Sequence, residues 1–143
     1  MVNITFKSGD TNLSETSPLD FGTVQAGTTS AIKTVVVTND GDSDAQQCTI
    51  EAKEATILNG FAVSSQVGTP QETAQAQFFA ADANAGTWYK YAVLGIGKDY
   101  AKKLGGTISN GGGEDSFATK WMPPANGTAG QKVWGNVFSC VYY

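Results

Sequence analysis

The sequence predicts an all-β protein in which two antiparallel sheets form a sandwich, and three observations carry this expectation. Short runs of β-branched and aromatic residues alternate with polar residues, as in half-buried strands. Glycine supplies 17 of 143 residues and, with Asn, Asp and Ser, places a turn after most of these runs. No repeat of fixed period is visible, so a solenoid or propeller is not expected. About eight to ten short strands fit best as two stacked sheets.

In the N-terminal half, the alternation predicts strands at residues Val2–Phe6, Leu19–Val24, Ile32–Asn39, Gln46–Lys53 and Gly60–Ser65. The clearest pattern is that of Gln46–Lys53, in which Cys48, Ile50 and Ala52 face one way and polar residues face the other. This strand is expected to have one buried side and one solvated side. The polar stretch Ser8–Ser17 is expected to be a loop or a loosely held arm. The expected organisation is an N-terminal strand and arm at residues 1–18 and one globular domain at residues 19–143.

In the C-terminal half, strands are predicted at Ala74–Ala81, Thr87–Ile96, Ser116–Met122 and Gln131–Tyr143. The first is ambiguous, because its Ala and Gln content also suits a helix, whereas Phe78, Phe79 and the neighbouring strands favour extended chain. The segment Lys98–Leu104 is compatible with one or two helical turns that end at Gly105. Asn110–Glu114, which is rich in glycine, is expected to be a flexible tip.

The composition excludes several classes of enzyme. The chain has no His, and Lys supplies all nine basic residues. Hydrolases that use a Ser-His-Asp or Cys-His arrangement and zinc sites with His ligands are therefore excluded. A glycosidase needs paired carboxylates, and no acid stands beside the signature of an aromatic cleft. We expect no enzymatic activity and no cofactor. The net charge of −4 argues against a nucleic-acid partner, which would require a basic patch.

Membrane and targeting signals are not expected either. No stretch approaches the roughly 20 apolar residues that span a bilayer. Residues Met1–Lys7 do not resemble a signal peptide, so the chain is expected in a cytoplasm. In that reducing compartment Cys48 and Cys140 are expected to be free, buried thiols, with a disulfide between them as the alternative.

An acidic turn is a weak candidate for calcium binding. Asp40, Asp42 and Asp44 follow the D-x-D-x-D spacing of a calcium loop, and Glu51 stands at its twelfth position. However, Ala45 occupies the position that requires glycine, and strands are expected on both sides instead of helices. A hairpin turn with a solvated acidic tip is the preferred interpretation, and no metal is expected.

Aromatic residues are candidates for a binding surface, either for a sugar or for a protein, and core packing is the alternative. The candidate binding residues are Trp88, Tyr91, Trp121, Trp134, Phe138 and Tyr142. In Val133–Tyr143 both faces of the strand are apolar, so the face that does not point to the core is also expected to pack against a partner. That packing partner is either a loop of the same chain or another protein chain.

Two segments resemble a known type of domain. The first is Leu19-Asp-Phe-Gly-Thr-Val-Gln-Ala-Gly27, followed by Thr34–Thr38 and Asn39-Asp-Gly41. It resembles the start of Ig-like domains of the choice-of-anchor and ASPM-SPD-2-Hydin type. Lys120–Gly130, which leads into Val133–Tyr142, resembles the closing hairpin of similar domains. Together the two segments cover about a third of the chain, and Phe61–Asn110 carries no resemblance.

The resemblance implies an Ig-like antiparallel β-sandwich without catalysis. Such domains are common in structural proteins of tailed-bacteriophage virions, where they decorate heads, tails or tail tips. The implied function is that of a capsid decoration, adaptor or tail-associated subunit, assembled in the host cytoplasm and retained in the virion. The implied partners are other virion proteins, and a homo-oligomer is expected because virion parts obey symmetry. The alternative is a carbohydrate-binding or adhesin module that recognises a cell-surface glycan.

Overall fold

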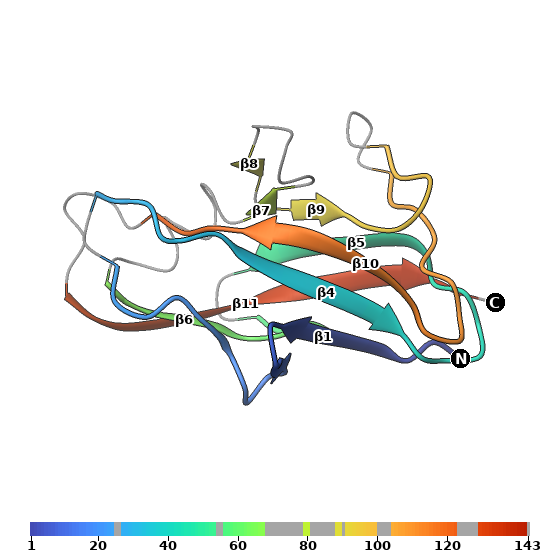
Figure 1. The fold of residues 1–143 in the computed structure, drawn as a ribbon, viewed down its shortest axis with the longest axis horizontal. Coiled ribbons are helices and arrows are strands. Elements are labelled where there is room, and N and C mark those ends of the chain that lie inside the picture. Colours follow the sequence, from blue (N-terminus) through green and yellow to red (C-terminus); the bar gives the residue numbers. More distant parts are fainter. Residues whose placement is uncertain are drawn as a thin grey trace.

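The protein is an all-β sandwich, as the sequence predicted. The computed structural model describes residues 1–24, 27–53, 56–67, 79–80, 88–89, 91–99, 104–122 and 129–142, and within these ranges it contains strands but no helix. Two sheets stack face to face, and the two termini lie near the same end of the sandwich (Figure 1). Over the same residues, no helix has the length and apolar character needed to cross a bilayer.

The two sheets have different strand orders. The first sheet consists of β2 (Thr11–Leu13), β1 (Ile4–Ser8), β4 (Lys33–Asn39), β10 (Gly113–Thr119), β7 (Phe79–Ala80) and β8 (Trp88–Tyr89), in that spatial order. The second consists of β3 (Leu19–Asp20), β6 (Val63–Val67), β11 (Ala129–Val141), β5 (Gln46–Lys53) and β9 (Tyr91–Val93). The described strand pairs are antiparallel, except that β3 runs parallel to β6.

The segment with the clearest alternation of apolar and polar residues is the one whose strand bounds were predicted most accurately. β5 has the predicted bounds, with Cys48, Ile50 and Ala52 buried and Gln47 and Lys53 exposed. β4 and β11 also lie where strands were expected, with ends shifted by one or two residues. Because one side of β5 packs on the core and the other is solvated, its residue pattern alone fixes which side faces inward.

The expected loop or arm at Ser8–Ser17 is wrong in part, because it contains β2. Gly9 adopts φ 58° in the turn after Ser8, and the chain reverses to pair Phe6 with Leu13. Leu13 is only 7% exposed, so its burial holds this short strand against the core. The N-terminal segment is therefore built into the edge of the first sheet.

Two further expectations differ from the structure. Helical turns were proposed for Lys98–Leu104, but at the described ends of this segment the main chains of Asp99 and Leu104 exchange hydrogen bonds of 2.8 and 3.1 Å in an antiparallel bridge. Residues 100–103 lie outside the described part. The single strand predicted at Thr87–Ile96 is divided, because β8 belongs to the first sheet and β9 to the second. Most of the ambiguous segment Ala74–Ala81 also lies outside the described residues, which include only β7.

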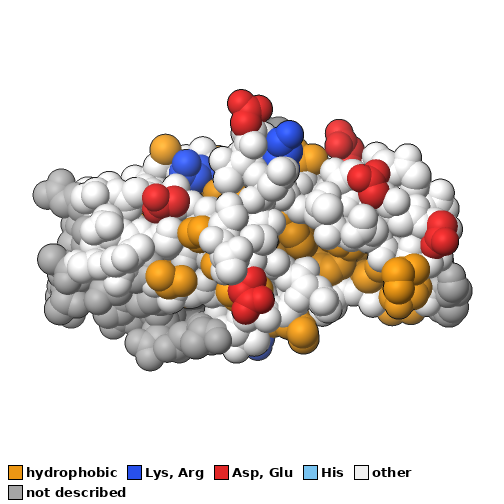
Figure 2. Space-filling view, turned by 90° about the horizontal axis from the view of Figure 1, so that it is seen from below, with side chains coloured by type: hydrophobic (Ala, Val, Ile, Leu, Met, Phe, Trp, Pro, Cys, Tyr) orange, Lys and Arg blue, Asp and Glu red, His pale blue; other side chains and the backbone are white. Residues whose placement is uncertain are grey.

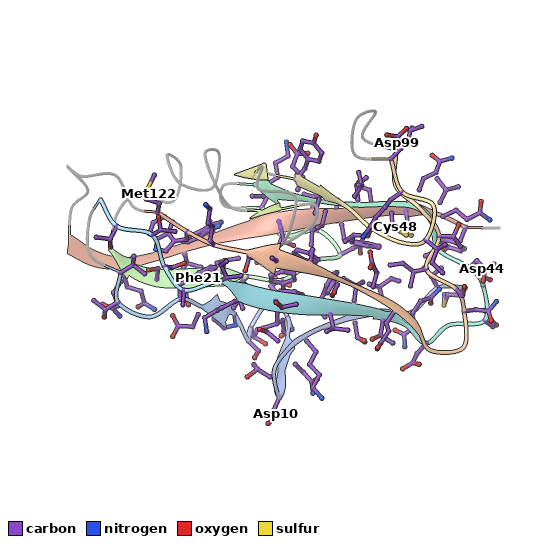
Figure 3. All side chains as sticks on the ribbon, turned by 45° about the horizontal axis from the view of Figure 1, so that its top comes forward. Asp10, Phe21, Asp44, Cys48, Asp99 and Met122 are labelled. Carbon is purple, nitrogen blue, oxygen red and sulfur yellow. The ribbon has the colours of Figure 1, made fainter. Side chains whose placement is uncertain are left out.

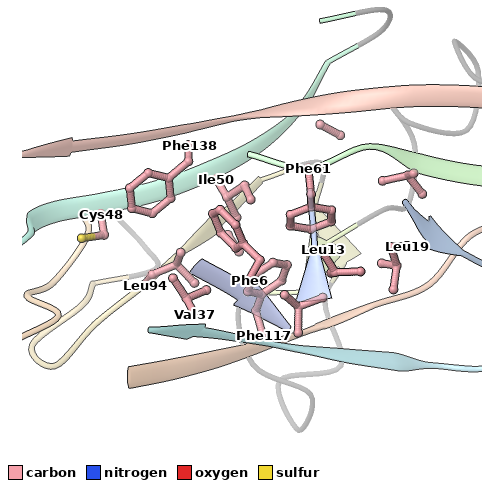
Figure 4. Packing of buried hydrophobic residues seen from close by; sticks show 14 of the residues in the cluster. Phe6, Leu13, Leu19, Val37, Cys48, Ile50, Phe61, Leu94, Phe117 and Phe138 are labelled. Carbon is pink, nitrogen blue, oxygen red and sulfur yellow. The ribbon is translucent and has the colours of Figure 1, made fainter. Parts of the chain in front are cut away.

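Phenylalanines join the two sheets at the centre of the core (Figure 4). Phe6 comes from the first sheet, and its ring centroid lies 5.1 Å from that of Phe61 and 5.7 Å from that of Phe138. Phe61 in turn stacks on Phe117 at 6.5 Å. Because each ring contacts rings of the opposite layer, the cluster fixes both the spacing and the alignment of the sheets.

A buried asparagine organises the end of the sandwich near the termini. The side-chain oxygen of Asn39 accepts hydrogen bonds from the main-chain N–H groups of Asn3 (3.2 Å) and Gly41 (3.0 Å). Its amide group donates to the carbonyls of Ser43 (2.9 Å) and Ile108 (3.1 Å). Asn39 has no exposed surface, so this one side chain satisfies main-chain groups of three separate segments.

A bulge interrupts the pairing of β5 with β11. The register shifts between Ser139 and Val141, and Gln47 on the opposite strand adopts φ 55°. Both cysteines lie at this bulge and both are free thiols, with Cys48 buried and Cys140 half-buried. Burial raises the pKa of Cys48 to about 12, with a smaller contribution from Cys140, and burial also raises the pKa of Cys140.

Replacing Asn39 with Ala is expected to lower the free energy of unfolding by about 2–4 kcal/mol, because buried main-chain groups lose their partners. The exposed Asn110, which contacts Asp44, is the matched control. Asn110→Ala should change stability by less than about 1 kcal/mol. Urea denaturation of both variants gives the comparison, and equal losses would contradict the role assigned to Asn39.

The raised pKa of Cys48 predicts a loss of stability in alkali. Between the ordinary value of 9.0 and about 12, the unfolded chain releases the thiol proton and the native protein retains it. The native state then binds more protons, so the free energy of unfolding falls as the pH rises. At pH 11 we expect wild type to have lost about 2 kcal/mol more than Cys48→Ala, relative to pH 8. Urea titrations at both pH values measure this difference. Cys140→Ala should keep most of the loss, whereas parallel curves for wild type and Cys48→Ala would contradict the prediction.

Candidate functional site: a groove between two open strand edges

A groove of about 980 Å³ runs between the two sheets on the β1 side of the molecule. Its lining includes Val2, Ile4, Leu13, Leu58, Cys140 and Tyr142. Figure 2 views the protein from this side, and hydrophobic side chains gather in the hollow at the middle of the face. We call this feature the seam groove, because β1 of the first sheet forms one wall and the end of β11 in the second sheet forms the other.

One wall of the seam groove carries an open strand edge at Ile4. Asn3 hydrogen-bonds toward β4, since its carbonyl accepts from the N–H of Asp40 at 2.9 Å. Main-chain groups alternate along a strand, so those of Ile4 point to the outer edge. β2 covers this edge only beside Phe6–Ser8, because the chain crosses to the second sheet at Ser14, whose carbonyl accepts from Ala62 at 3.1 Å. Within the described residues, no hydrogen bond takes up the main-chain groups of Ile4.

The opposite wall carries a second open edge at Cys140. The main-chain N–H of Phe138 donates to the carbonyl of Leu58 at 2.9 Å, on the groove side of β11. By the same alternation, the main-chain groups of Cys140 point to that side. The chain turns away after Leu58, where Asn59 adopts φ 57°, and no described segment continues the pairing. The groove therefore lies between two strand edges with unused donors and acceptors.

The chemistry of the groove favours binding of an uncharged, extended chain. Glu15 is the one charged residue in the described lining, and the remaining side chains are apolar, hydroxyl or amide groups, with the Cys140 thiol. A nucleophilic cysteine needs a lowered pKa, whereas burial raises the pKa of Cys140. An added strand would pair with the open edges through its main chain and place alternate side chains on the apolar lining.

Most of the predicted binding residues do not meet on the surface. Trp121 and Trp134 are at most 1% exposed, so their assignment to a binding surface is corrected to core packing. Phe138 is 4% exposed and packs in the core, but it also lines the floor of the seam groove. Tyr142 is 49% exposed and lines the seam groove, and Tyr91 is half-buried at the start of β9. The main chain of Trp88 lies in β8, and its side chain lies outside the described part.

The two buried tryptophans form a pair that joins the sheets at the end opposite the termini. Trp121 follows β10 of the first sheet, and its ring centroid lies 4.7 Å from that of Trp134 in β11. The large apolar area of the two rings accounts for their burial. The sequence pattern was compatible with either a core or a surface position, because it does not say which ring of one sheet meets which ring of the other.

The weak calcium candidate is not supported by the arrangement of its carboxylates. Asp42 hydrogen-bonds the amino group of Met1, which lowers the pKa of Asp42. Asp44 instead accepts hydrogen bonds from the main-chain and side-chain N–H groups of Asn110, both at 2.9 Å. Asp40 is exposed, and Glu51 lies within β5 opposite Val137, away from the turn. Over the described residues, no three acidic or cysteine side chains converge on a metal position.

The second apolar face of β11 is partly exposed. Val133 is 55% and Val141 is 39% exposed, on the side opposite the core residues Trp134 and Phe138. The sequence left open a covering loop or another chain, and no described segment buries these two valines. This face and the seam groove meet near the C-terminal end of β11, where Val141 precedes Tyr142.

Among the residues that line the seam groove, sequence reasoning named Phe138 and Tyr142 as binding candidates but missed those of the opposite wall. The alternation of Val2, Ile4 and Phe6 predicted a strand, but it contained no sign that the strand would have an open edge. Leu58, which is 56% exposed, lay in a segment without a clear pattern. The groove results from the positions at which two loops leave their sheets, and these positions depend on packing of residues distant in sequence.

Comparison of the chain with protein-family models, with curated proteins and with solved structures found no match.

Proposed function

We propose that this protein is a non-enzymatic structural component of a virus particle, specifically a capsid decoration, adaptor or tail-associated subunit of a tailed bacteriophage. It acts by binding an extended segment of another virion protein in the seam groove. The single observation that carries the proposal is the presence of two open strand edges, at Ile4 and Cys140, on facing walls of an apolar groove.

The physical argument for this occupant is the need to satisfy the two edges. Unpaired strand edges invite a further strand, and proteins that must stay separate cover or charge such edges. Here Glu15 is the one charge in the described lining, so a neutral strand enters without burying an unpaired charge. A lysine or arginine at one end of that strand would complement Glu15.

The sequence supports the virion setting. Leu19–Gly27 and the strand that follows resemble the opening of Ig-like domains that are common in bacteriophage virion proteins. The absence of His removes the usual general base from any catalytic interpretation. The partly exposed valines of β11 add a second apolar surface for contact within a particle.

The alternative, a carbohydrate-binding or adhesin module, has less support. It relies on exposed aromatic rings, and Trp121 and Trp134 are at most 1% exposed. Among the candidate rings whose side chains are described, Tyr142 is exposed and Tyr91 is half-buried. A flat tryptophan and tyrosine fluorescence response to a panel of glycans would be the expected result under our proposal.

The proposal predicts that Ile4→Lys removes the protein from particles. A lysine at the open edge of β1 places an unpaired charge where the added strand must pack, so we expect at least about a tenfold loss of incorporation. Quantitative mass spectrometry of purified particles, produced with each variant in place of wild type, measures the effect.

Ile32→Lys is the matched control, because Ile32 is 56% exposed and is not part of the groove lining. It should enter particles as wild type does. Equal melting temperatures of the isolated variants would exclude misfolding as the cause of a loss. Absence of the wild-type chain from purified particles would overturn the proposed function, and equal incorporation of Ile4→Lys would overturn the role of the groove.

A further inference from the structure

The two cysteines lie on the core side of neighbouring strands, beside the bulge between β5 and β11. Phe138 of β11 is paired with Ile50 of β5, and both point into the core. Side chains repeat every two residues along a strand, so the next core-facing positions are Cys140 and Cys48. Figure 4 shows Cys48 at the Phe138 end of the buried cluster. Cys140 packs against the same cluster.

The main-chain hydrogen bonds of Cys48 show to which side of β5 its N–H and carbonyl groups point. Its main-chain N–H donates to the carbonyl of Gly106 at 3.2 Å, and its carbonyl accepts from the N–H of Leu94 at 2.9 Å. Both groups therefore point away from β11, so Cys48 shares no main-chain hydrogen bond with Cys140, and the register shift at the bulge places Cys140 opposite Gln47 and Cys48. In a regular antiparallel ladder, facing residues without mutual hydrogen bonds have Cα atoms about 4.5 Å apart, and a disulfide spans Cα separations of roughly 4.4–6.8 Å.

We propose that Cys48 and Cys140 form an intramolecular disulfide when the folded protein meets a low-molecular-weight disulfide such as oxidised glutathione. The Cys140 thiolate attacks one sulfur of the oxidant, forms a mixed disulfide and releases one glutathione thiolate. The Cys48 thiolate then attacks the Cys140 sulfur, forms the protein disulfide and releases the second glutathione. Two protein thiols lose two protons and two electrons, and one glutathione disulfide is reduced to two thiols.

Exposure sets this order of attack. Cys140 is half-buried and lines the seam groove, so a small oxidant can reach it. Cys48 is fully buried, and its thiol donates a hydrogen bond to the carbonyl of Ala45 at 3.3 Å. Cys48 therefore serves as the resolving thiol. Because burial raises the pKa of both thiols, cross-linking should be slow at neutral pH and faster at about pH 9.

The cross-link would join the C-terminal end of β11 to β5 at the bulge. It closes a loop that runs from Cys48 to Cys140, most of the length of the chain, and such long loops restrict the unfolded state strongly. In a reducing cytoplasm the two thiols stay reduced, and the cross-link forms when the free protein, with its groove accessible, meets an oxidant. The cross-link does not rest on the proposed function.

The test uses the purified full-length protein, incubated at pH 8.5 with oxidised glutathione or with dithiothreitol. After oxidation, the expected result is a monomer whose mass is about 2 Da lower, with no free thiol under denaturing conditions. Peptide mapping should identify a linked pair that contains Cys48 and Cys140. The midpoint of thermal unfolding should rise by roughly 5–10 °C relative to the reduced protein.

Two variants provide the controls. Cys48→Ser lacks the resolving thiol, so it should accumulate a glutathione adduct at Cys140 and show no rise in the unfolding midpoint. Cys140→Ser should remain unmodified, because Cys48 is buried. Stable glutathione adducts of wild type, disulfide-linked dimers or two persistent free thiols would each overturn the inference. None of these outcomes bears on particle incorporation, so the proposed function is tested separately.

Discussion

The contact between phenylalanines of opposite sheets is the interaction on which the rest of the structure depends. Phe6 and Phe117 come from the first sheet, and they meet Phe61 and Phe138 of the second layer. Isolated sheets of this size would expose one apolar face each, so the sandwich becomes stable only when these rings interdigitate. The Trp121–Trp134 pair closes the core toward the other end.

Two buried asparagines provide hydrogen bonds to main-chain groups at the ends of strands, where the sheets do not supply partners. Asn136 accepts a hydrogen bond from the N–H of Phe61 at 2.9 Å and donates one to its carbonyl at 2.6 Å. Near the termini, Asn39 accepts a hydrogen bond from the N–H of Asn3 and donates one to the carbonyl of Ile108. Both side chains are fully buried, and in each the amide oxygen accepts and the amide nitrogen donates at least one hydrogen bond to the main chain. They therefore connect strands to loops without leaving a buried amide oxygen or nitrogen unpartnered.

The seam groove follows from the same arrangement. Asn136 anchors the chain at Phe61, and Ser14 bonds to Ala62, so two loops cross between the sheets at neighbouring points. The strands beyond these crossings, at Ile4 and Cys140, then lack neighbours on one side. The two loop crossings that close the core therefore also leave two strand edges without a neighbouring strand. These unpaired edges are the physical basis for a binding function at this position.

The sequence by itself determined the all-β class, the bounds and inward face of β5, and the approximate positions of β4 and β11. These features depend on alternation and turn residues, which are local signals. The tertiary structure alone decided the strand β2, the bridge of Asp99 with Leu104, the burial of Trp121 and Trp134, and the seam groove. Each of these depends on which distant segments pack together. A ring suited to a surface is equally suited to a core, and an edge is open or closed according to where its neighbour turns away.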